Sequence, residues 1–388
     1  MGRDHRFALA TRGAWTALWR PLRPESPDLL HLDCLRFLAA CAVVFLHYSS
    51  ELPALAHVAQ IQRAGIAVDL FFVISGAVLT HVYLGHIRSW PDYPAFLWKR
   101  IARLVPLHWA TLAVYVVLGA AITVAGALKN PVQFEWDCLP QTALMAHAFG
   151  ACRDFAWNGP SWSISAEMAI YLLFPAALFG LGRRPWWGLA IMAALIATLT
   201  ARFGDEWLWW STDGGVARAL PSFLFGIALY GLRPRLARIP CTGALMWAAL
   251  AGAVGLVAIN AGGLWLLGAV YLIATLGIAA DARGKSGILV RMLAPQGRLT
   301  YSLYMIHSPV LFVLGIGVAD HLLRLDGAAK AAAVIVIAGI AYVLSRLSLA
   351  CFETPARRWL TRQGSAAVVR PEVVAAGAGN SVPVIVDG

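Results

Sequence analysis

Long apolar runs, separated by short polar and charged segments, make up most of this 388-residue chain. An α-helix needs about 20 consecutive apolar residues to cross the hydrocarbon core of a bilayer, and ten runs approach or reach that length. The pattern therefore predicts an all-α, polytopic integral membrane protein with about ten transmembrane helices. The expected spans are residues 33–50, 66–84, 104–127, 162–181, 187–203, 216–232, 241–259, 263–280, 299–318 and 329–351. A further stretch, 138–150, is shorter and contains Pro140, so we expect it to lie in a loop.

Composition and charge agree with this prediction. The chain is 60% hydrophobic and 13% charged, whereas a soluble domain carries roughly 25% charged residues. The net charge of +11 falls mainly in the short segments between the spans, which argues against a nucleic-acid-binding surface and for the Lys and Arg excess of cytoplasmic loops. With the N-terminus in the cytoplasm, 22 basic residues lie on the cytoplasmic side and seven outside. We therefore expect both termini in the cytoplasm and a long outer loop at 128–161.

The two ends of the chain lack the membrane pattern. Residues 1–30 contain no long apolar core followed by a small-residue cleavage site, so we expect a cytoplasmic tail and no cleavable signal peptide. Residues 361–388 are rich in Gly, Ala, Val and Pro without periodicity, which predicts a disordered cytoplasmic tail. The intervening residues 31–360 are expected to form one transmembrane domain.

Two of the six cysteines, Cys138 and Cys152, fall in the expected outer loop. They could form a disulfide there or remain free thiols, and the sequence leaves both open. The other four cysteines lie within or at the ends of spans. No spacing of cysteine, histidine or acidic residues is typical of a metal site.

The first expected span carries Arg36 near its cytoplasmic end and His47 near its outer end. Eleven residues are about three helical turns, so the two side chains share nearly one face and lie roughly 16 Å apart along the axis. A central arginine costs about 3 kcal/mol on insertion scales. Anchoring at the headgroups would explain Arg36 alone, whereas the pair on one stripe favours an internal polar path.

The second span runs from outside to inside and places Asp69 at a depth similar to that of His47. A buried acid beside a histidine would fix its tautomer and raise its basicity. Glu51, one turn after His47, is a competing partner. Ser75 lies in the middle of the span, where it could donate to a ligand or to its own helix. Gly76 beside it permits close approach of another backbone.

Three basic residues, Lys99, Arg100 and Arg103, lie at the cytoplasmic mouth of the third span. Ordinary anchoring on the cytoplasmic side explains any one of them. The functional interpretation is a phosphate clamp, because Arg100 and Arg103 share a helix face and guanidinium groups bind phosphate bidentately.

Two later spans add polar residues that an apolar helix would not need. The fourth opens with Trp162 and Ser163 at the outer surface and carries Glu167 a turn deeper. The ninth carries Tyr304 and His307. Since an ionisable group inside a span is costly and usually faces a cavity, we expect these residues near a site.

In this order and on these spans, the segments resemble integral-membrane acyltransferase family 3, which includes bacterial O-acetyltransferases of surface polysaccharides and rhizobial Nod-factor modifiers. The resemblance covers roughly residues 31–360. It rests on LDCLRFLAACAVVFLH, VDLFFVISGAVL, KRIARLVP and PSWSISAEMAIY, with weaker support from TYSLYMIHSPV and ETP. Ala77 departs from the pattern, because phenylalanine is common at that position.

The resemblance implies an acyltransferase that transfers groups other than aminoacyl groups. The donor would be acyl-CoA, most often acetyl-CoA, acting as a substrate, with no cofactor bound permanently. The acceptor would be a sugar hydroxyl of a lipid-linked saccharide, a lipopolysaccharide or an exopolysaccharide. The protein would lie in the inner (plasma) membrane of a bacterium, and a separate extracytoplasmic partner could complete the transfer.

The resemblance also implies roles for the residues singled out above. His47 would be the general base, oriented by Asp69 or Glu51, and an acyl-His47 intermediate is an alternative to direct transfer. The oxyanion would be held by Ser75, by the backbone near Gly76 or by Arg36. The expected catalytic residues are thus His47, Asp69, Glu51, Arg36 and Ser75; those that bind the donor are Lys99, Arg100 and Arg103; those that bind the acceptor are Trp162, Ser163, Glu167, Tyr304 and His307.

A transporter is the alternative function. Ten spans with an internal polar stripe would also suit an exporter of a glycan or of an anionic metabolite. An enzyme would release free CoA from acyl-CoA, whereas a transporter would not. A non-catalytic scaffold would leave the cost of the buried ionisable residues unexplained.

Overall fold

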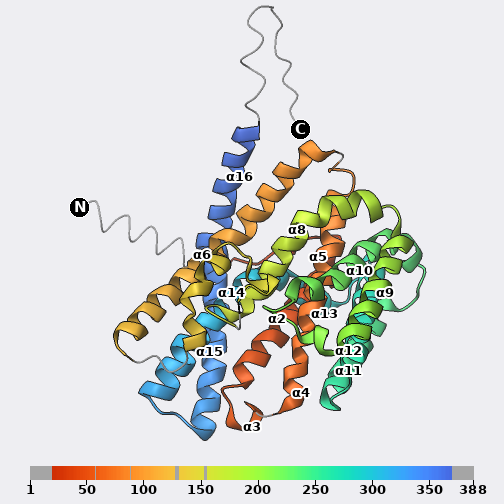
Figure 1. Ribbon diagram of the computed structural model, residues 1–388. Coiled ribbons are helices and arrows are strands. Elements are labelled where there is room, and N and C mark those ends of the chain that lie inside the picture. Colours follow the sequence, from red (N-terminus) through yellow and green to blue (C-terminus); the bar gives the residue numbers. More distant parts are fainter. Residues whose placement is uncertain (1–19, 57, 88, 127–130, 153–154, 369–388) are drawn as a thin grey trace, which may run out of the picture.

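The computed structural model describes residues 20–56, 58–87, 89–126, 131–152 and 155–368 (Figure 1). These residues form α-helices, short 3₁₀ helices and two π-helical segments, and no strand of a sheet occurs among them. The long helices are α2(Leu30–Ser49), α5(Ala67–Tyr83), α6(Tyr93–Val124), α8(Trp162–Leu181), α9(Pro185–Phe203), α10(Gly215–Leu236), α11(Thr242–Ala258), α12(Gly263–Ala282), α14(Thr300–Val310), α15(Gly327–Ser348) and α16(Thr354–Val368). The short α-helices are α3(Pro53–Ala56), α4(Ala59–Gln62), α7(Leu139–Ala143) and α13(Ile288–Leu293).

Every apolar run expected to span the membrane is a helix. Within the described ranges, nine helical segments are long and apolar enough to cross a bilayer. The tenth, α11, has 17 residues, which is about 26 Å and slightly less than a hydrocarbon core of about 30 Å. The prediction of a polytopic, all-α membrane protein is therefore confirmed, and α11 is shorter than any of the other nine helical segments. The apolar stretch 138–150 contains only the five-residue α7 and is not a span, as expected.

Close backbone contact joins α5 to α10. A Cβ atom on Gly76 of α5 would lie 2.2 Å from the carbonyl oxygen of Phe223, and one on Gly226 of α10 would lie 2.0 Å from that of Val73. Any larger side chain at either position would push the two helices apart. The glycine noted in the second span therefore fixes the face that α5 turns to α10.

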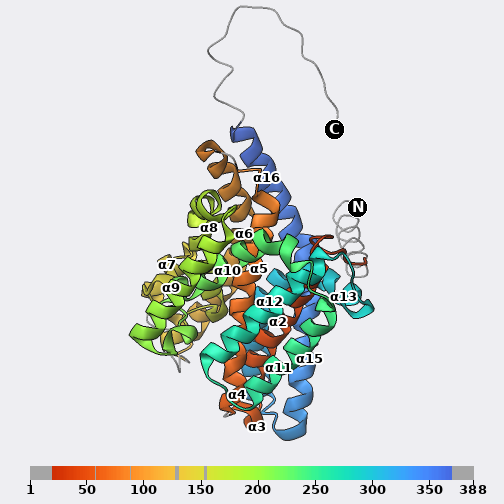
Figure 2. The same ribbon diagram turned by 90° about the vertical axis from the view of Figure 1, so that its right-hand side faces the viewer.

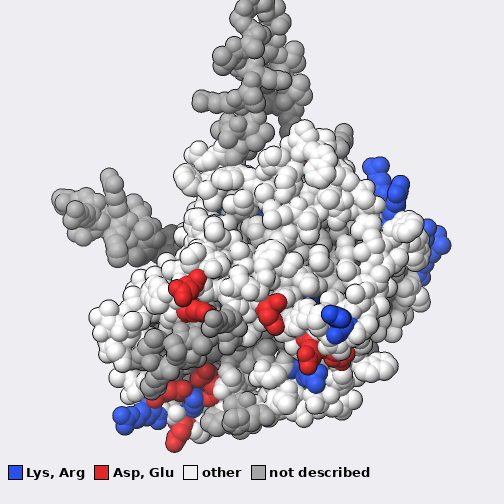
Figure 3. All heavy atoms as spheres, in the orientation of Figure 1, with Lys and Arg blue, Asp and Glu red and all other residues white. Residues whose placement is uncertain are grey.

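Helix α2 lies inside the bundle, where it packs against α5, α12 and α14 (Figures 1 and 2). These three neighbours come from separate parts of the sequence. A broad area of the face drawn in Figure 3 carries no Lys, Arg, Asp or Glu, and charged side chains of both signs gather below it. Such an uncharged area is what lipid contact requires.

Helices α6 and α16 lie side by side and extend beyond the rest of the bundle at one end, at the top of Figures 1 and 2. The distribution of Lys and Arg predicts that this end faces the cytoplasm, and we call it the cytoplasmic end. Helix α6 has 32 residues, or about 48 Å, which is longer than a hydrocarbon core of about 30 Å. The indole Nε1 of Trp98 donates a 2.8 Å hydrogen bond to the carbonyl of Leu360 and ties the two helices together.

Helix α16 reaches Val368, so residues 361–368 are helical where a disordered tail was predicted. The packing of its first turns on α6 accounts for the difference, because tertiary contacts stabilise a helix that composition alone does not indicate. The rest of both predicted tails, residues 1–19 and 369–388, lies outside the described residues. In the outer loop, Cys138 and Cys152 form a disulfide, which settles the choice that the sequence left open.

Candidate functional site

A cavity of about 860 Å³, the outer cavity, opens on the side of the bundle opposite to the protruding ends of α6 and α16. His47 of α2 lines it, together with Arg63 and Arg218. Much of the remaining wall is aromatic and comes from helices and loops far apart in the sequence. The aromatic residues are Tyr115, Phe155, Trp157, Trp162, Trp209 and Tyr304. Large apolar faces with a few polar groups are typical of a ligand-binding cavity.

His47 is paired with a second histidine, His307 of α14. The Nδ1 atom of His47 lies 3.1 Å from Nε2 of His307 and 2.9 Å from the carbonyl oxygen of Val43. His307 in turn has its Nδ1 atom 3.1 Å from the carbonyl oxygen of Leu303. His307 is fully buried and is not among the residues that line the outer cavity, whereas His47 is. The expected contact of His307 with an acceptor stays a prediction.

These contacts define the protonation pattern of the pair. A carbonyl oxygen can only accept, so Nδ1 of His307 carries the proton and its Nε2 is an acceptor. Nδ1 of His47 faces that acceptor and the carbonyl of Val43, and therefore carries a proton as well. The lone pair of His47 is left on Nε2, on a side chain that lines the outer cavity. A neutral imidazole with a fixed tautomer is suited to general-base chemistry.

The expected partners of His47 are elsewhere. Asp69 is fully buried and accepts hydrogen bonds from Arg218 at 2.7 and 3.1 Å and from Ser222 at 3.2 Å. Asp69 points to α10 because it lies two turns from Gly76, on the face of α5 that meets α10. Glu51 lies 3.9 Å from Lys330. In this structure the two acids have these other partners, and the Nδ1 atom of His47 faces Val43 and His307 instead.

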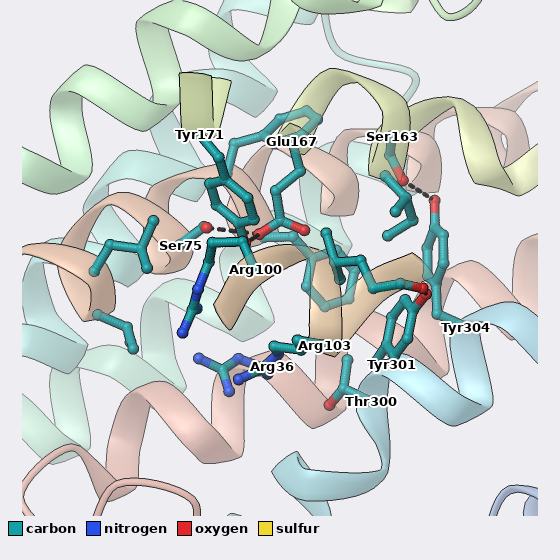
Figure 4. Close-up of a pocket in the computed structure, with 16 residues that line it drawn as sticks. Arg36, Ser75, Arg100, Arg103, Ser163, Glu167, Tyr171, Thr300, Tyr301 and Tyr304 are labelled. Carbon is teal, nitrogen blue, oxygen red and sulfur yellow. Dashed lines mark hydrogen bonds between the residues drawn. The ribbon is translucent and has the colours of Figure 1, made fainter. Parts of the chain in front are cut away.

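A small cavity of about 100 Å³, the inner cavity, has Arg36, Arg100 and Arg103 among its lining residues (Figure 4). Tyr304 lines both cavities. The hydroxyl of Ser163 donates a 2.7 Å hydrogen bond to that of Tyr304. Ser163 and Tyr304 therefore form the wall at which the two cavities meet, while Trp162 belongs to the outer cavity alone.

Glu167 lies in the inner cavity, where it accepts a 2.7 Å hydrogen bond from the hydroxyl of Ser75 and one from Tyr171 (Figure 4). This differs from the expectation that Glu167 contributes to the acceptor side together with Trp162. Ser75 likewise points into the inner cavity and is occupied by Glu167. Its predicted role as an oxyanion donor beside His47 is not supported by this geometry.

At the cytoplasmic end of the inner cavity, Arg36 and Arg103 converge on one carboxylate, Glu25. Nη1 of Arg36 lies 2.7 Å from Oε2 of Glu25, and Arg103 forms a bidentate pair with both carboxylate oxygens. Burial alone would raise the pKa of Glu25, but Arg103 and Arg36 hold it well below its ordinary value. Arg36 therefore belongs with Arg103, as part of an anion-binding group, and lies in a different cavity from His47.

Arg100 lines the inner cavity beside Arg103. Its guanidinium lies over the rings of Tyr83, Phe96 and Tyr171 at 5.4, 6.0 and 5.8 Å and donates a 3.1 Å hydrogen bond to the Tyr83 hydroxyl. Aromatic faces stabilise a cation and leave its remaining N–H groups for a ligand. Arg100, Arg103 and Lys99 also line a third cavity of about 590 Å³, open to the cytoplasmic side, which we call the basic basin.

The sequence did not single out Glu25 and Arg218. Glu25 is an acid in a basic cytoplasmic segment, and that contrast was its only signal. Arg218 is 3% exposed at the start of α10. The sequence held one clue: Arg218 lies at the outer end of its span, where basic residues are few, which indicates a buried acidic partner.

Comparison with known proteins gives three findings. A family model described as an acyltransferase domain (acyltransferase family 3) matches residues 29–346. "Acyltransferase MdmB" of Streptomyces mycarofaciens is 26% identical over 377 residues, which cover 88% of this chain and 94% of the relative. "Protein 2 in picA locus" of Rhizobium radiobacter is 29% identical over 149 residues, which cover 37% of this chain and 72% of the relative. No solved structure matches the chain.

Proposed function

The chain belongs to acyltransferase family 3 and is a multi-pass membrane protein, and on this premise we propose which acyl transfer it performs. It moves an acyl group, acetyl in the simplest case, from cytoplasmic acyl-CoA to a sugar hydroxyl on the outer side of the inner (plasma) membrane. The sugar belongs to a cell-surface or exported glycan. His47 is the general base.

The observation that carries this proposal is the chain of cavities through shared residues. The basic basin shares Arg100 and Arg103 with the inner cavity, and the inner cavity shares Tyr304 with the outer one. The path is thus cationic at the cytoplasmic end and aromatic at the outer end, where His47 lies. This polarity suits a donor with phosphates at one end and a reactive acyl group at the other.

The inner cavity supports a thin, extended donor. Its volume of about 100 Å³ is much smaller than the 860 Å³ of the outer cavity, and a pantetheine arm is a thin, unbranched chain for most of its length. Arg36 and His47 lie roughly 16 Å apart along α2, a distance that an extended phosphopantetheine arm covers. Phosphates held by Arg100 and Arg103 would therefore leave the thioester near Tyr304 and within reach of the outer cavity.

The transfer follows from the protonation pattern. Nε2 of His47 takes the proton from the acceptor hydroxyl as its oxygen attacks the thioester carbonyl. The hydroxyl of Tyr304 donates to the oxyanion of the tetrahedral intermediate. The C–S bond then breaks, the thiolate of CoA leaves with the electron pair, and the imidazolium returns the proton to it. An ester and free CoA result, and His47 is neutral again.

The aromatic wall of the outer cavity supports a sugar acceptor. Tryptophan and tyrosine rings offer flat apolar faces against which the C–H face of a sugar ring can pack. The cavity is also large enough for a ring and its neighbours, at about 860 Å³. Trp162 is held in place because Arg218 lies 5.1 Å over its ring.

The test is thiol release from acetyl-CoA by the purified full-length protein with a panel of glycan acceptors. Release that requires both an acceptor and His47 supports the proposal, and His47→Ala is compared with His321→Ala, an exposed histidine on the outer side. Near-normal turnover in His47→Ala would overturn the base assignment. If the wild type does not bind acetyl-CoA, the assignment of acyl-CoA as the donor is refuted. One equivalent of thiol released without acceptor, with acyl-His47 in the mass spectrum, would replace direct transfer by a covalent intermediate.

A further inference from the structure

The basic basin lies between the first turns of α6 and the helix α16. Six cationic side chains and the hydroxyl of Thr361 line it, and no acidic or apolar residue is among its lining residues. The cations of α6 are Lys99, Arg100 and Arg103, and those of α16 are Arg357, Arg358 and Arg362. Two segments more than 250 positions apart in the sequence thus turn their basic residues to one hollow.

Anchoring to lipid headgroups does not require this arrangement. Lys99 and Arg103 are four residues apart on α6, and so are Arg358 and Arg362 on α16, and like charges at this spacing destabilise a helix. Packing the two helices side by side adds repulsion between the pairs. Basic residues that served only as anchors would repel one another less if they were spread around the rim of the bundle. The cluster therefore indicates an anion that neutralises it.

On the α16 side of the basin, the described carboxylates Glu25 and Glu353 interact with Arg357 but not with Arg358 or Arg362. Glu25 is paired with Arg103 and Arg36, and Glu353 accepts a 2.6 Å hydrogen bond from Ser302. Among the described residues, the salt bridges include neither Arg358 nor Arg362. Both side chains are exposed and available to a ligand.

The connectivity of the donor decides which phosphate lies where. In coenzyme A the pantetheine arm is attached to the 5′-diphosphate, and the ribose 3′-phosphate lies at the far end from the thiol. Arg100 and Arg103 line both the inner cavity and the basin, so the diphosphate belongs at that junction. The 3′-phosphate then lies farther out, in the part of the basin that α16 lines.

We infer that α16 supplies the subsite for the ribose 3′-phosphate of the acyl-CoA, with Arg358 and Arg362 as its principal ligands and Arg357 beside them. This inference rests on the proposed function. It assigns a binding role to a helix beyond residue 346, where the family match ends. It also makes the enzyme selective for CoA over 3′-dephospho-CoA, because only CoA carries the phosphate monoester.

The experiment measures the dissociation constants of CoA and 3′-dephospho-CoA by calorimetry on the full-length protein in detergent. The variant is Arg358→Gln/Arg362→Gln. The matched control is Arg235→Gln/Arg238→Gln, which removes two exposed arginines of another cytoplasmic segment. The wild type and the control should bind CoA about tenfold more tightly than 3′-dephospho-CoA, because a phosphate held by two guanidinium groups forms charge-assisted hydrogen bonds. The α16 variant should bind CoA only as tightly as the wild type binds 3′-dephospho-CoA, and its affinity for 3′-dephospho-CoA should be unchanged.

Unchanged affinity for 3′-dephospho-CoA in the α16 variant also serves as its folding control. Two results would overturn the inference while leaving the proposed function standing: a wild type that binds both ligands equally, or a variant that weakens both by the same factor. A wild type that binds neither would refute the donor itself. The wild type and both variants are also titrated with short-chain phosphatidate micelles. If the α16 variant loses binding to the micelles but still prefers CoA over 3′-dephospho-CoA, the subsite belongs to a lipid headgroup and the inference fails.

Discussion

Replacing His307 by phenylalanine tests whether the histidine pair is the working unit of the outer cavity. The change keeps an aromatic ring in a fully buried site but removes the Nε2 acceptor that lies 3.1 Å from Nδ1 of His47. The carbonyl of Val43, at 2.9 Å from the same atom, remains as a second acceptor. We therefore expect a partial loss of orientation and no loss of the base itself.

The size of the effect follows from one hydrogen bond. Because Nδ1 of His47 keeps the carbonyl of Val43 as an acceptor, the loss is that of one net hydrogen bond, about 0.5–1.5 kcal/mol. Each 1.36 kcal/mol is tenfold in rate, so kcat should fall roughly 2- to 13-fold. KM for acetyl-CoA should stay unchanged, because the donor phosphates bind in the other two cavities. His307→Gln retains an acceptor oxygen and should recover most of the lost rate.

The assay is acceptor-dependent thiol release at saturating acetyl-CoA for the wild type, His307→Phe and His307→Gln, with the melting temperature of each measured in the same detergent. An unchanged kcat in His307→Phe would refute the orienting role. Two results would show that His307 acts through packing. One is a change in KM instead of kcat, and the other is a His307→Gln variant that is as slow as His307→Phe at equal melting temperature.

Three further predictions follow from the cavities and their walls. Glu25→Gln should lower KM for acetyl-CoA several-fold at constant kcat. The pKa of the Glu25 carboxyl is held below its ordinary value, so the group is charged at neutral pH and competes with phosphate for Arg36 and Arg103. A higher KM would mean that Glu25 preorganises the two arginines instead. Tyr304→Phe should lower kcat by about 10²-fold, the usual cost of one oxyanion donor, with little change in KM; an unchanged kcat would remove the tyrosine from the reaction. Asp69→Asn should destabilise the fold by about 3–5 kcal/mol, because Arg218 is left buried without its counter-charge; an unchanged melting temperature would refute this.

The positions of the spans could be predicted because they depend on local properties. Each span is a run of apolar residues of fixed length, and the distribution of Lys and Arg orients all of them at once. The two π-helical segments and the short 3₁₀ helices were not foreseen, since they depend on how neighbouring helices pack. Helix α16 was misjudged beyond residue 361 for the same reason: α6, which supports it, lies more than 250 positions earlier.

The sequence predicts the level of each polar residue along its helix, whereas the direction in which it points around the helix axis could not be predicted. His47 and Asp69 were both expected near the outer surface, yet Asp69 turns to Arg218 on α10 and His47 to His307 on α14. One clue was present for Asp69. Gly76 lies seven residues, or about two turns, further on and therefore on the same face, and a mid-span glycine marks the side where another helix approaches closely. For His47 the sequence held no comparable clue.

The arrangement of the cavities favours an enzyme over a transporter in physical terms. A transporter must carry its whole substrate through the midplane, and the inner cavity, at about 100 Å³, is the smallest of the three cavities. In the proposed reaction only the acyl group passes Tyr304, as a neutral thioester on a thin arm. The phosphates stay with the basic basin, which six cations line, whereas the outer cavity has two, Arg63 and Arg218, and Arg218 is already paired with Asp69. Transfer of the acyl group to an acceptor in the outer cavity thus carries it across the membrane, while CoA leaves by the side from which it entered.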